Sequence, residues 1–338
     1  MEFIGQFHEQ KKSMELDLLN RKIMYLLGKN ARYSESSIAK ALKTSKEVVH
    51  YRIKRMQEDG FLHGFITVVD PEKLGLVVHA VHLHLFPSSP HEALIELLVN
   101  EEKVTNVKYY NSPHEMQFSV ATCSTREFSV FWHEFLNKHH AHIKDYSLST
   151  ILEDYFLGLD FLVEPSEQPE ITEHKGSSFQ KEFAQQKNSA AALDEKDYQI
   201  LEVLQMNSRM PVIKIAQEMR LAPGSVQRRL ASLIEGGIIK HFIPYASFTF
   251  LGYQWYRLHL RTKNLNEPSF LEYLKQHPQV VWMSKRLGKW NYDLSIFSLN
   301  NTEFNQVVKD LHTHLGDSLI DYEPAMVFKQ LKYKPRVR

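Results

Sequence analysis

The sequence predicts an α+β fold built from two copies of one module, each a winged helix-turn-helix domain followed by a ferredoxin-like βαββαβ domain. Three observations lead to this prediction: an internal duplication, a three-helix pattern at the start of each copy, and a later alternation of strands with helices. With 338 residues, 43% of them hydrophobic, the chain is long enough for more than one core.

The duplication appears as residue matches at a constant spacing. Leu16 matches Leu193, 177 positions further on, and the same spacing continues without a gap to Leu74 and Leu251. From Val104 onward the spacing is 176. Further matched pairs are Asp17 with Asp194, Asn30 with Asn207, Arg32 with Arg209, and Arg52 with Arg229. A repeat of this length sets the architecture, because each copy must fold in the same way.

The repeat and the local composition predict the domain boundaries. The segment between the copies contains Pro165, Pro169 and several Ser and Gln residues without apolar periodicity, which is typical of a linker. The expected parts are an N-terminal extension (1–14), a first winged helix-turn-helix (15–70), a first ferredoxin-like domain (71–163), a linker (164–192), a second winged helix-turn-helix (193–247) and a second ferredoxin-like domain (248–338).

Composition excludes several classes of protein. No apolar run approaches the roughly 18–20 residues of a membrane span, and the first residues are polar, so a cytoplasmic protein is expected. The single Cys123 excludes an intrachain disulfide and a cysteine-based zinc site. The chain has 18 histidines, but their local groups lack the carboxylates that would complete a ligand set, so neither a metal nor a cofactor is predicted. These groups are His79, His82 and His84, and His139, His140 and His142.

The net charge of +1 conceals an uneven distribution. Residues 11–66 contain 12 Lys and Arg against 6 Asp and Glu, whereas residues 193–243 contain 7 against 6. The first head is therefore basic and the second nearly neutral, which predicts that the first supplies most of any attraction to phosphate groups.

The start of copy one has the pattern of three short helices. Asp17 and Ser34 are placed as N-caps, and Thr44 with Glu47 has capping-box spacing. The third helix buries a stripe that ends near Gly60, and residues 61–69 are then expected to form a β wing, as are residues 238–242 in copy two. In copy two, Pro223 lies in the first turn of the third helix, where its missing N–H costs little.

The outer face of each third helix carries side chains suited to a DNA groove. Arg and Lys contact phosphates or guanine edges, and Gln, Ser and His bond to base edges. The alternative is an ordinary solvated helix face. The candidate DNA-binding residues are Lys46, His50, Tyr51, Arg52, Lys54 and Arg55 in copy one, and Ser225, Gln227, Arg228 and Arg229 in copy two.

The second part of each copy alternates strands with helices. In residues 76–86, Val81, Leu83 and Leu85 share one face of a strand, while His82 and His84 share the other. A helix (91–100), strands (104–110 and 116–121), a helix (127–138) and a last strand (143–151) follow, and copy two repeats the order over 254–328. This order gives a ferredoxin-like sheet with two helices on one face.

The matched residues resemble the Lrp/AsnC (feast/famine) family of transcriptional regulators. The residues that carry the resemblance are Asp17, Ile23, Leu27, Asn30, Arg32, Ile38-Ala39, Val49, Arg52-Ile53, Gly60, Ile66, Asp70 and Leu74-Gly75. The resemblance implies a winged helix-turn-helix joined to a βαββαβ (RAM) domain that dimerises and binds amino acids or related small molecules. A homodimer or higher homo-oligomer through the RAM domains is therefore expected, although the sequence leaves open whether the two RAM domains pair within one chain.

In this family the loop between the second and third strands carries a glycine and an acidic residue near the effector. Copy two keeps this pattern in Gly288, Trp290, Tyr292 and Asp293, the candidate effector-binding residues, while copy one has Pro113 in the loop. Glycine lets backbone N–H groups approach a carboxylate, and proline lacks the N–H. A structural hairpin that needs Gly288 is the alternative.

The resemblance implies a sequence-specific double-stranded DNA-binding regulator rather than an enzyme, with an amino-acid-like effector. The first copy would chiefly bind DNA and the second would chiefly sense. One alternative is a tetrapyrrole enzyme, since siroheme decarboxylases resemble the same architecture; its candidate groups are Tyr109, Tyr110 and His114 in copy one and Arg286 and Tyr292 in copy two. Another is a second head that serves only in assembly.

Overall fold

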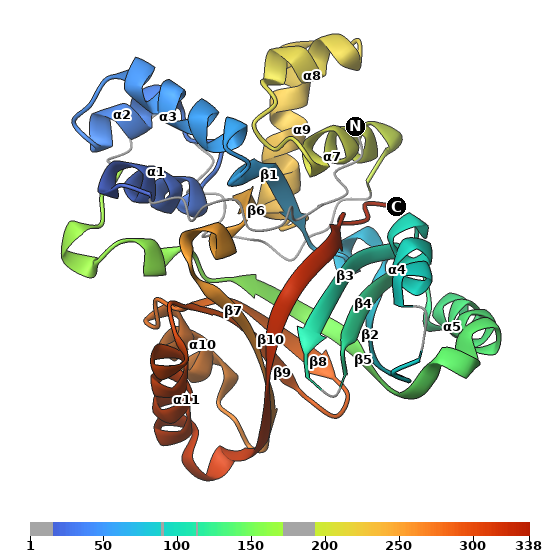
Figure 1. Cartoon of the computed structure of the whole chain (residues 1–338). Helices are drawn as coiled ribbons and strands as arrows, with labels where there is room; N and C mark the ends of the chain where they lie inside the picture. Colours follow the sequence, from blue (N-terminus) through green and yellow to red (C-terminus); the bar gives the residue numbers. More distant parts are fainter. Residues whose placement is uncertain (1–15, 89–90, 113, 172–192) are drawn as a thin grey trace. The chain divides into compact units, whose positions relative to one another are not determined.

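The computed structural model describes residues 16–88, 91–112, 114–171 and 193–338, which form two compact units (Figure 1). The head unit contains the described residues before residue 75, those of 158–247, and 337–338; the sheet unit contains the described residues of 75–157 and 248–336. Each unit therefore combines matching parts of both copies. The predicted extension 1–14 and most of the predicted linker, 172–192, lie outside the described residues.

The head unit holds two three-helix heads, each followed by a strand. In copy one these are α1 (Leu18–Lys29), α2 (Glu35–Ala41), α3 (Lys46–Glu58) and β1 (Leu62–Val69). In copy two they are α7 (Glu195–Gln205), α8 (Val212–Glu218), α9 (Pro223–Glu235) and β6 (Ile239–Ala246). No described helix of the chain is long and apolar enough to cross a membrane.

In the two heads, the predicted helix caps agree with the structure at all but one position. Asp17 and Ser34 cap α1 and α2 by accepting backbone N–H bonds, and Asp194 forms a capping box on α7. The prediction for Thr44 was wrong, because Ser45 caps α3 by accepting the N–H of Val48 at 3.2 Å. A serine one position later has the same hydroxyl and lies at the correct distance from the first free N–H groups.

The two predicted wing strands are present and pair with each other. β1 and β6 form a two-stranded antiparallel sheet in which Ile66 lies opposite Ile243. Each strand would otherwise expose both of its edges, so the pairing satisfies the backbone groups along one edge of each copy's strand at once.

The sheet unit contains one βαββαβ element from each copy. Copy one supplies β2 (Val77–Leu85), α4 (His91–Asn100), β3 (Val104–Asn111), β4 (Met116–Thr122), α5 (Thr125–His139) and β5 (Ile143–Phe156). Copy two supplies β7 (Gln254–Thr262), α10 (Glu267–Lys275), β8 (Val280–Leu287), β9 (Tyr292–Ser298), α11 (Asn301–Leu315) and β10 (Leu319–Tyr333). The strand orders β5-β2-β4-β3 and β10-β7-β9-β8 are the ferredoxin-like order.

Two long strands join these sheets into one closed eight-stranded sheet. β5 pairs first with β2, where Leu148 faces Val81, and then with β8, where Tyr155 faces Met283. β10 likewise pairs with β7 and then with β3. The two ferredoxin-like domains thus pair within one chain, and β5 extends five residues beyond the predicted end at Ile151 because these residues bond to β8.

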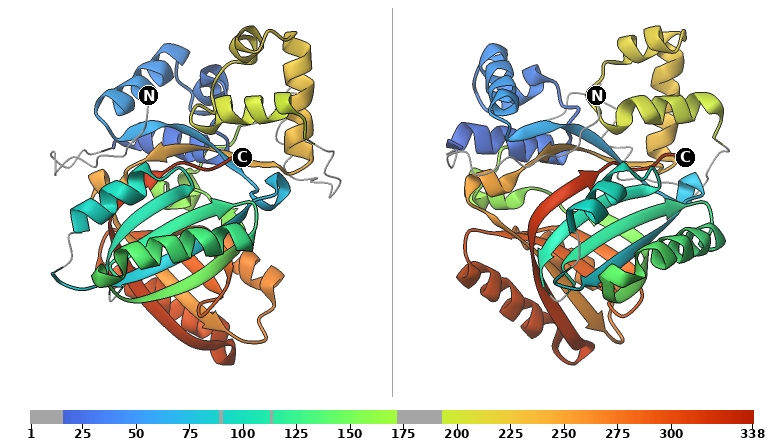
Figure 2. Two further views of the ribbon diagram at one scale, coloured as in Figure 1. Left: turned by 90° about the vertical axis from the view of Figure 1, so that its right-hand side faces the viewer. Right: turned by 45° about the vertical axis from the view of Figure 1, so that its right-hand side comes forward.

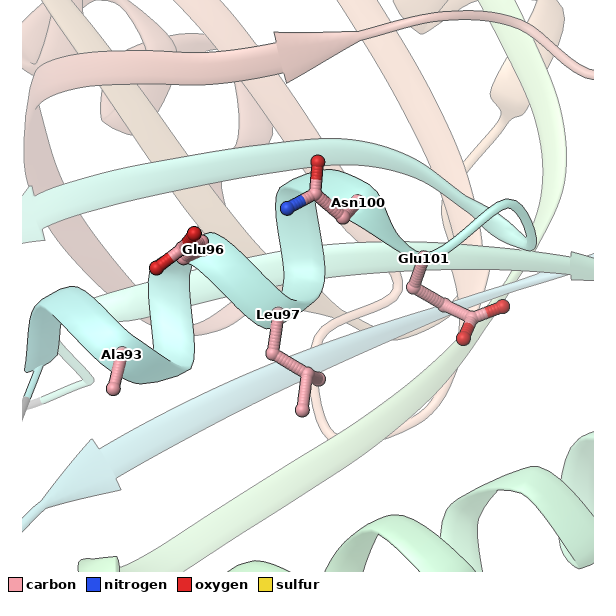
Figure 3. Close-up of a pocket in the computed structure, with 5 residues that line it drawn as sticks. All are labelled: Ala93, Glu96, Leu97, Asn100 and Glu101. Atoms are coloured by element: carbon pink, nitrogen blue, oxygen red, sulfur yellow. The ribbon is translucent and has the colours of Figure 1, made fainter.

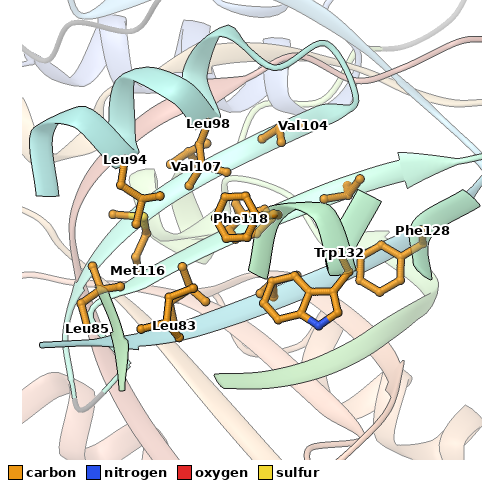
Figure 4. Close-up of a cluster of buried hydrophobic side chains, with 14 residues drawn as sticks. Leu83, Leu85, Leu94, Leu98, Val104, Val107, Met116, Phe118, Phe128 and Trp132 are labelled. Atoms are coloured by element: carbon orange, nitrogen blue, oxygen red, sulfur yellow. The ribbon is translucent and has the colours of Figure 1, made fainter. Parts of the chain in front are cut away.

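Each sheet packs its outer face on its own pair of helices (Figure 1 and Figure 2). In copy one, Leu83, Phe118 and Trp132 belong to one fully apolar cluster (Figure 4). Copy two forms the matching cluster around Leu258 and Phe270. The predicted alternation along β2 is confirmed: Val81, Leu83 and Leu85 enter the apolar cluster. His82 therefore points to the opposite, inner face of the closed sheet.

Candidate functional site

The third helix of copy one, α3, presents most of its predicted DNA-binding residues to solvent. Val49, Ile53 and Met56 are buried and hold the helix against the head. Lys46, His50, Tyr51, Lys54 and Arg55 are exposed, with Tyr51 at 63% exposure. This face is basic and carries one large aromatic side chain that can contact a base or sugar.

Ion pairs hold several of these side chains in the unbound protein. His50 lies 3.1 Å from Glu35, Lys54 lies 3.6 Å from Glu58, and Arg55 lies 3.0 Å from Asp59. Such exposed pairs contribute at most about 1 kcal/mol each. Phosphate groups can therefore replace these carboxylates at low cost.

Arg52 and its counterpart Arg229 have a different environment from the rest of the set. Arg52 pairs with Asp17, the N-cap of α1, and Arg229 pairs with Asp194 at 2.8 Å and Asp197 at 2.8 Å. Both arginines brace the third helix to the first helix of the same head. The signal was present in the sequence, because Asp and Arg recur together in both copies.

The third helix of copy two, α9, presents fewer charges. Gln227 and Arg228 are exposed, while Ser225 is partly buried. The Arg228 side chain donates from Nε to the carbonyl of Gly224 at 3.3 Å, within the first turn of α9. With Arg229 engaged by the carboxylates of α7, one arginine and one amide remain outermost on this face.

A reciprocal contact joins the two heads. Arg32 donates from Nη1 to the carbonyls of Ser208 at 2.5 Å and Met210 at 3.3 Å. Arg209 donates from Nη1 to the carbonyls of Ala31 at 2.5 Å and Tyr33 at 3.1 Å. Arg32 and Arg209 are equivalent in the repeat, and each bonds to the same part of the other head. The two heads therefore form a pseudo-two-fold pair.

Aromatic rings complete this contact. The Arg32 guanidinium lies 5.3 Å from the ring of Phe242, and that of Arg209 lies 5.0 Å from the ring of Phe65. Burial and the neighbouring Arg209 lower the pKa of Arg32 to about 10, which leaves it charged at neutral pH. The sequence analysis noted these matched arginines only as signs of the repeat, and it missed their role in joining the heads.

The structure does not gather the four predicted effector residues at one surface. Gly288 is packed closely on β5, since an added Cβ would lie 2.8 Å from Cβ of Ser149. Trp290 is partly exposed beside His259, with 6.3 Å between ring centroids. Tyr292 and Asp293 lie on opposite faces of β9. The equivalent loop of copy one contains Pro113, which is outside the described residues.

Tyr292 belongs to the helix-covered face, where its hydroxyl donates to Glu267 at 3.0 Å. Asp293 lies on the inner face and is completely buried. The structure thus provides a packing reason for Gly288 and places Asp293 away from the loop surface.

Asp293 is the centre of a buried ionic cluster. Arg257 donates from Nε to Asp293 at 2.8 Å and approaches its second oxygen at 2.6 Å through Nη2. Arg286 approaches the same oxygen at 2.5 Å. Burial alone would raise the pKa of Asp293, but the two guanidinium groups outweigh it and hold that pKa well below its usual range.

Histidines from both copies meet beside this cluster. The rings of His82 and His259, which are equivalent in the repeat, lie 5.2 Å apart, and Arg286 lies 3.3 Å from Nε2 of His82. Burial, His259 and Arg286 lower the pKa of His82 well below its usual value. Burial and the nearby Arg286 and Arg257 lower the pKa of His259 to about 4, although Asp293 opposes this effect.

Lys108 and Tyr110 on β3 complete the inner face on the side of copy one. Burial, followed by repulsion from Arg257, lowers the pKa of Lys108 well below its usual value. The Tyr110 hydroxyl donates to Gln117 at 3.1 Å, and burial raises its pKa. We name Asp293, Arg257, Arg286, His82, His259, Lys108 and Tyr110 the inner cluster.

The alternative enzyme residues are divided between the two faces. Tyr110 and Arg286 belong to the inner cluster, and His114 approaches it with 6.4 Å between its ring centroid and that of His82. Tyr109 instead packs on the helix side, with its hydroxyl 3.3 Å from Nδ1 of His91. Across the described residues, no group of three or more His, Cys, Asp or Glu side chains is arranged to hold a metal ion.

An open hollow of about 410 Å³ lies along α4, lined by Ala93, Glu96, Leu97, Asn100 and Glu101 (Figure 3). Its charged side chains are acidic. The hollow is therefore unsuited to the phosphate groups of DNA or to a carboxylate ligand.

Known proteins are similar to this chain in both copies of the module. A family model described as a winged helix-turn-helix DNA-binding domain matches residues 16–62 and again residues 193–240. The chain is 25% identical to the HTH-type transcriptional regulator FL11 of Pyrococcus abyssi over 118 residues, which cover 35% of this chain and 78% of that protein. It is 26% identical to the regulatory protein AsnC of Haemophilus influenzae over 113 residues, which cover 33% of this chain and 75% of that protein.

A solved structure shares the doubled architecture. The siroheme decarboxylase NirDL superimposes with a TM-score of 0.60 over 94% of this chain and 93% of that chain, at 13% sequence identity. At this identity the likeness concerns the fold alone. Each of the two sequence relatives is matched over less than the length of one copy, and their names describe a transcriptional regulator and a regulatory protein. The chain thus carries the winged helix-turn-helix of that family model twice, once at the start of each copy, and it is similar in sequence to regulators that include AsnC.

Proposed function

We propose that this chain is a sequence-specific double-stranded DNA-binding transcriptional regulator whose two heads bind DNA as one unequal pair. The observation that carries the proposal is the reciprocal contact of Arg32 and Arg209, which joins the two heads in one unit. A pseudo-two-fold pair of heads suits two half-sites of related sequence on a duplex.

The two half-sites should differ in strength. Lys46, Lys54 and Arg55 on α3 supply the phosphate attraction of the first head, with His50 and Tyr51 between them. Gln227 and Arg228 on α9 offer bonds to base edges but less charge. The first half-site should therefore contribute most of the affinity, and the second should contribute mainly sequence preference.

A small-molecule effector completes the proposal. The sheet unit would bind an amino-acid-like compound and thereby alter DNA binding. Because both sheets use their edge strands within one chain, a homodimer or higher homo-oligomer would have to assemble through other surfaces of the sheet unit.

Selection of bound DNA from a random pool, with the full chain, tests this function. We expect an enriched sequence with two unequal half-sites and affinity that falls steeply with salt. The molar mass of the complex, measured by light scattering, should correspond to one chain for each pair of half-sites or to a multiple of it. A pool that shows no enrichment would contradict sequence-specific binding.

A tetrapyrrole enzyme is the second candidate. The likeness to NirDL over nearly the whole chain and the buried inner cluster favour it. Another solved structure of that enzyme is described as a complex with an iron-uroporphyrin III analogue. Incubation of the chain with iron-uroporphyrin III should then produce a Soret band that remains with the protein through gel filtration, whereas a regulator should release the compound.

A further inference from the structure

The inner cluster contains more buried positive charge than negative. Lys108, Arg257 and Arg286 are each at most 6% exposed. Among the residues that the structure describes, Asp293 is the sole carboxylate buried to this degree. Two guanidinium groups share Asp293, and the half-buried carboxylate of Asp154 on β5 also acts on Arg257 and Lys108. When Lys108 is protonated, three positive charges therefore face two negative ones, and one positive charge remains without a counter-charge.

An unbalanced charge of this kind is unfavourable inside a protein. Removal of an ion from water costs several kcal/mol unless a partner of opposite sign replaces the lost hydration. The neutral partners His82 and Ser149 contact Arg286 at 3.3 Å and 3.4 Å, respectively, but neither supplies a negative charge. An anion from solution would balance the cluster.

Hydrogen-bonding atoms in the same place lack partners. Arg286 Nε and His259 Nδ1 are buried, and neither has a hydrogen-bond partner within the described part of the chain. His259 Nδ1 lies 3.5 Å from Asp293, beyond a good hydrogen bond. Buried polar atoms are nearly always bonded in native proteins, so each such orphan indicates a missing partner.

We propose that the inner face of the closed sheet binds the carboxylate of a small organic acid between Arg286 and His259 of copy two and Lys108 of copy one. A planar guanidinium suits a carboxylate, and a single negative charge balances the excess where a doubly charged phosphate would exceed it. This inference rests on the proposed function, because it assigns the proposed effector to the inner face of the sheet and not to the loop of Gly288 and Trp290.

The protonation of the cluster supports this assignment. Lys108 and His259 both have lowered pKa values, so an anion that arrives beside them favours their charged forms. Binding should therefore be accompanied by proton uptake. The proposed site uses residues of both copies. It therefore exists only because the two sheets close on each other within one chain.

The experiment is a titration of the full chain with sodium acetate at constant ionic strength, followed by calorimetry in buffers of different ionisation enthalpy. We expect saturable acetate binding, absent with chloride alone, and net proton uptake. Arg286→Gln should weaken acetate binding about tenfold or more. Arg261→Gln is the matched control. Arg261 lies on β7, a strand that contributes to the inner cluster, but its side chain is exposed and pairs with Asp321 at 3.5 Å.

If Arg286→Gln fails to fold, Lys108→Met replaces it and should weaken acetate binding and reduce proton uptake. The inference would be overturned if acetate bound no more strongly than chloride. It would also be overturned if the wild type and the variant that folds bound acetate with equal affinity. Binding of iron-uroporphyrin III without binding of acetate would also overturn it. A mobility-shift assay on the same samples separates this outcome from the proposed function, because DNA binding without acetate binding would leave the DNA-binding function intact.

Discussion

The two copies of the module agree closely at the junction of the heads and disagree on the surfaces that face ligands. Arg32 and Arg209 make equivalent bonds, and Phe242 and Phe65 provide equivalent rings. By contrast, α3 presents several basic side chains where α9 presents mainly Gln227 and Arg228. A pseudo-symmetric interface constrains both copies to the same residues, whereas a surface that touches only a ligand does not.

The inner face of the closed sheet shows the same contrast. His82 and His259 occupy equivalent positions and face each other. At three other positions copy one has uncharged residues where copy two has charged ones: Ala80 for Arg257, Tyr110 for Arg286, and Gln117 for Asp293. The reverse holds at Lys108 of copy one, where copy two has Ser284. Duplication within one chain thus allows the two halves of a once-equal pair to acquire different charges.

The largest effect on stability should distinguish Asp293 from Gln117, its counterpart in copy one. Asp293→Asn removes the carboxylate that both buried guanidinium groups share and should lower the free energy of unfolding by about 3–5 kcal/mol. Gln117→Leu removes neutral hydrogen bonds and should cost about 1–2 kcal/mol. Urea unfolding followed by tryptophan fluorescence measures both, because all 4 tryptophans lie in the sheet unit. Equal losses would contradict the charge asymmetry.

Acidification should destabilise the sheet unit through its buried histidines. The folded pKa of His259, about 4, lies below the unfolded value near 6.5, so the unfolded state binds the proton first. The stabilisation is therefore complete above pH 6.5 and is lost as the pH falls towards 4, by about 3 kcal/mol. His259→Phe should flatten the pH dependence of unfolding. The same change at the exposed His140 should leave the slope as in the wild type.

The head junction should respond equally to changes in either copy. Arg32→Ala and Arg209→Ala each remove charge-assisted bonds to two carbonyls, at a cost of about 2 kcal/mol. Backbone hydrogen exchange of the paired strands β1 and β6 measures the effect. Clearly unequal protection in the two variants would show that the junction is less symmetric than its bonds indicate.

The smallest expected effect is on DNA affinity, and it compares variants on the outer face of α3 with variants on the outer face of α9. Replacement of Lys54 and Arg55 by alanine should weaken DNA binding about tenfold to thirtyfold and reduce its salt dependence. Replacement of Gln227 and Arg228 should weaken it less and alter the preferred sequence. Arg52 and Arg229 are unsuited to this test, since they brace the heads. Fluorescence anisotropy with labelled duplex DNA gives the affinities, and equal losses would remove the proposed division between the heads.

Much of the fold could be predicted because its signals are local. The caps Asp17 and Ser34, the proline in α9 and the alternation along β2 depend on residues a few positions apart. The site was harder to predict. The sequence pattern could identify Asp293 as notable within its loop, but it could not show that Arg257 and Arg286 would surround it, because those strands meet only in the folded sheet.

The sequence by itself determined the duplication, the helix-turn-helix heads, the ferredoxin-like order and the helix-facing side of each strand. Short-range spacing and hydrophobic periodicity are sufficient for these features. Only the tertiary structure decided that β1 pairs with β6, that β5 continues onto β8, and that Arg52 braces α1. An exposed strand edge or a charged side chain has several chemically suitable partners, and only the folded chain brings one of them within bonding distance.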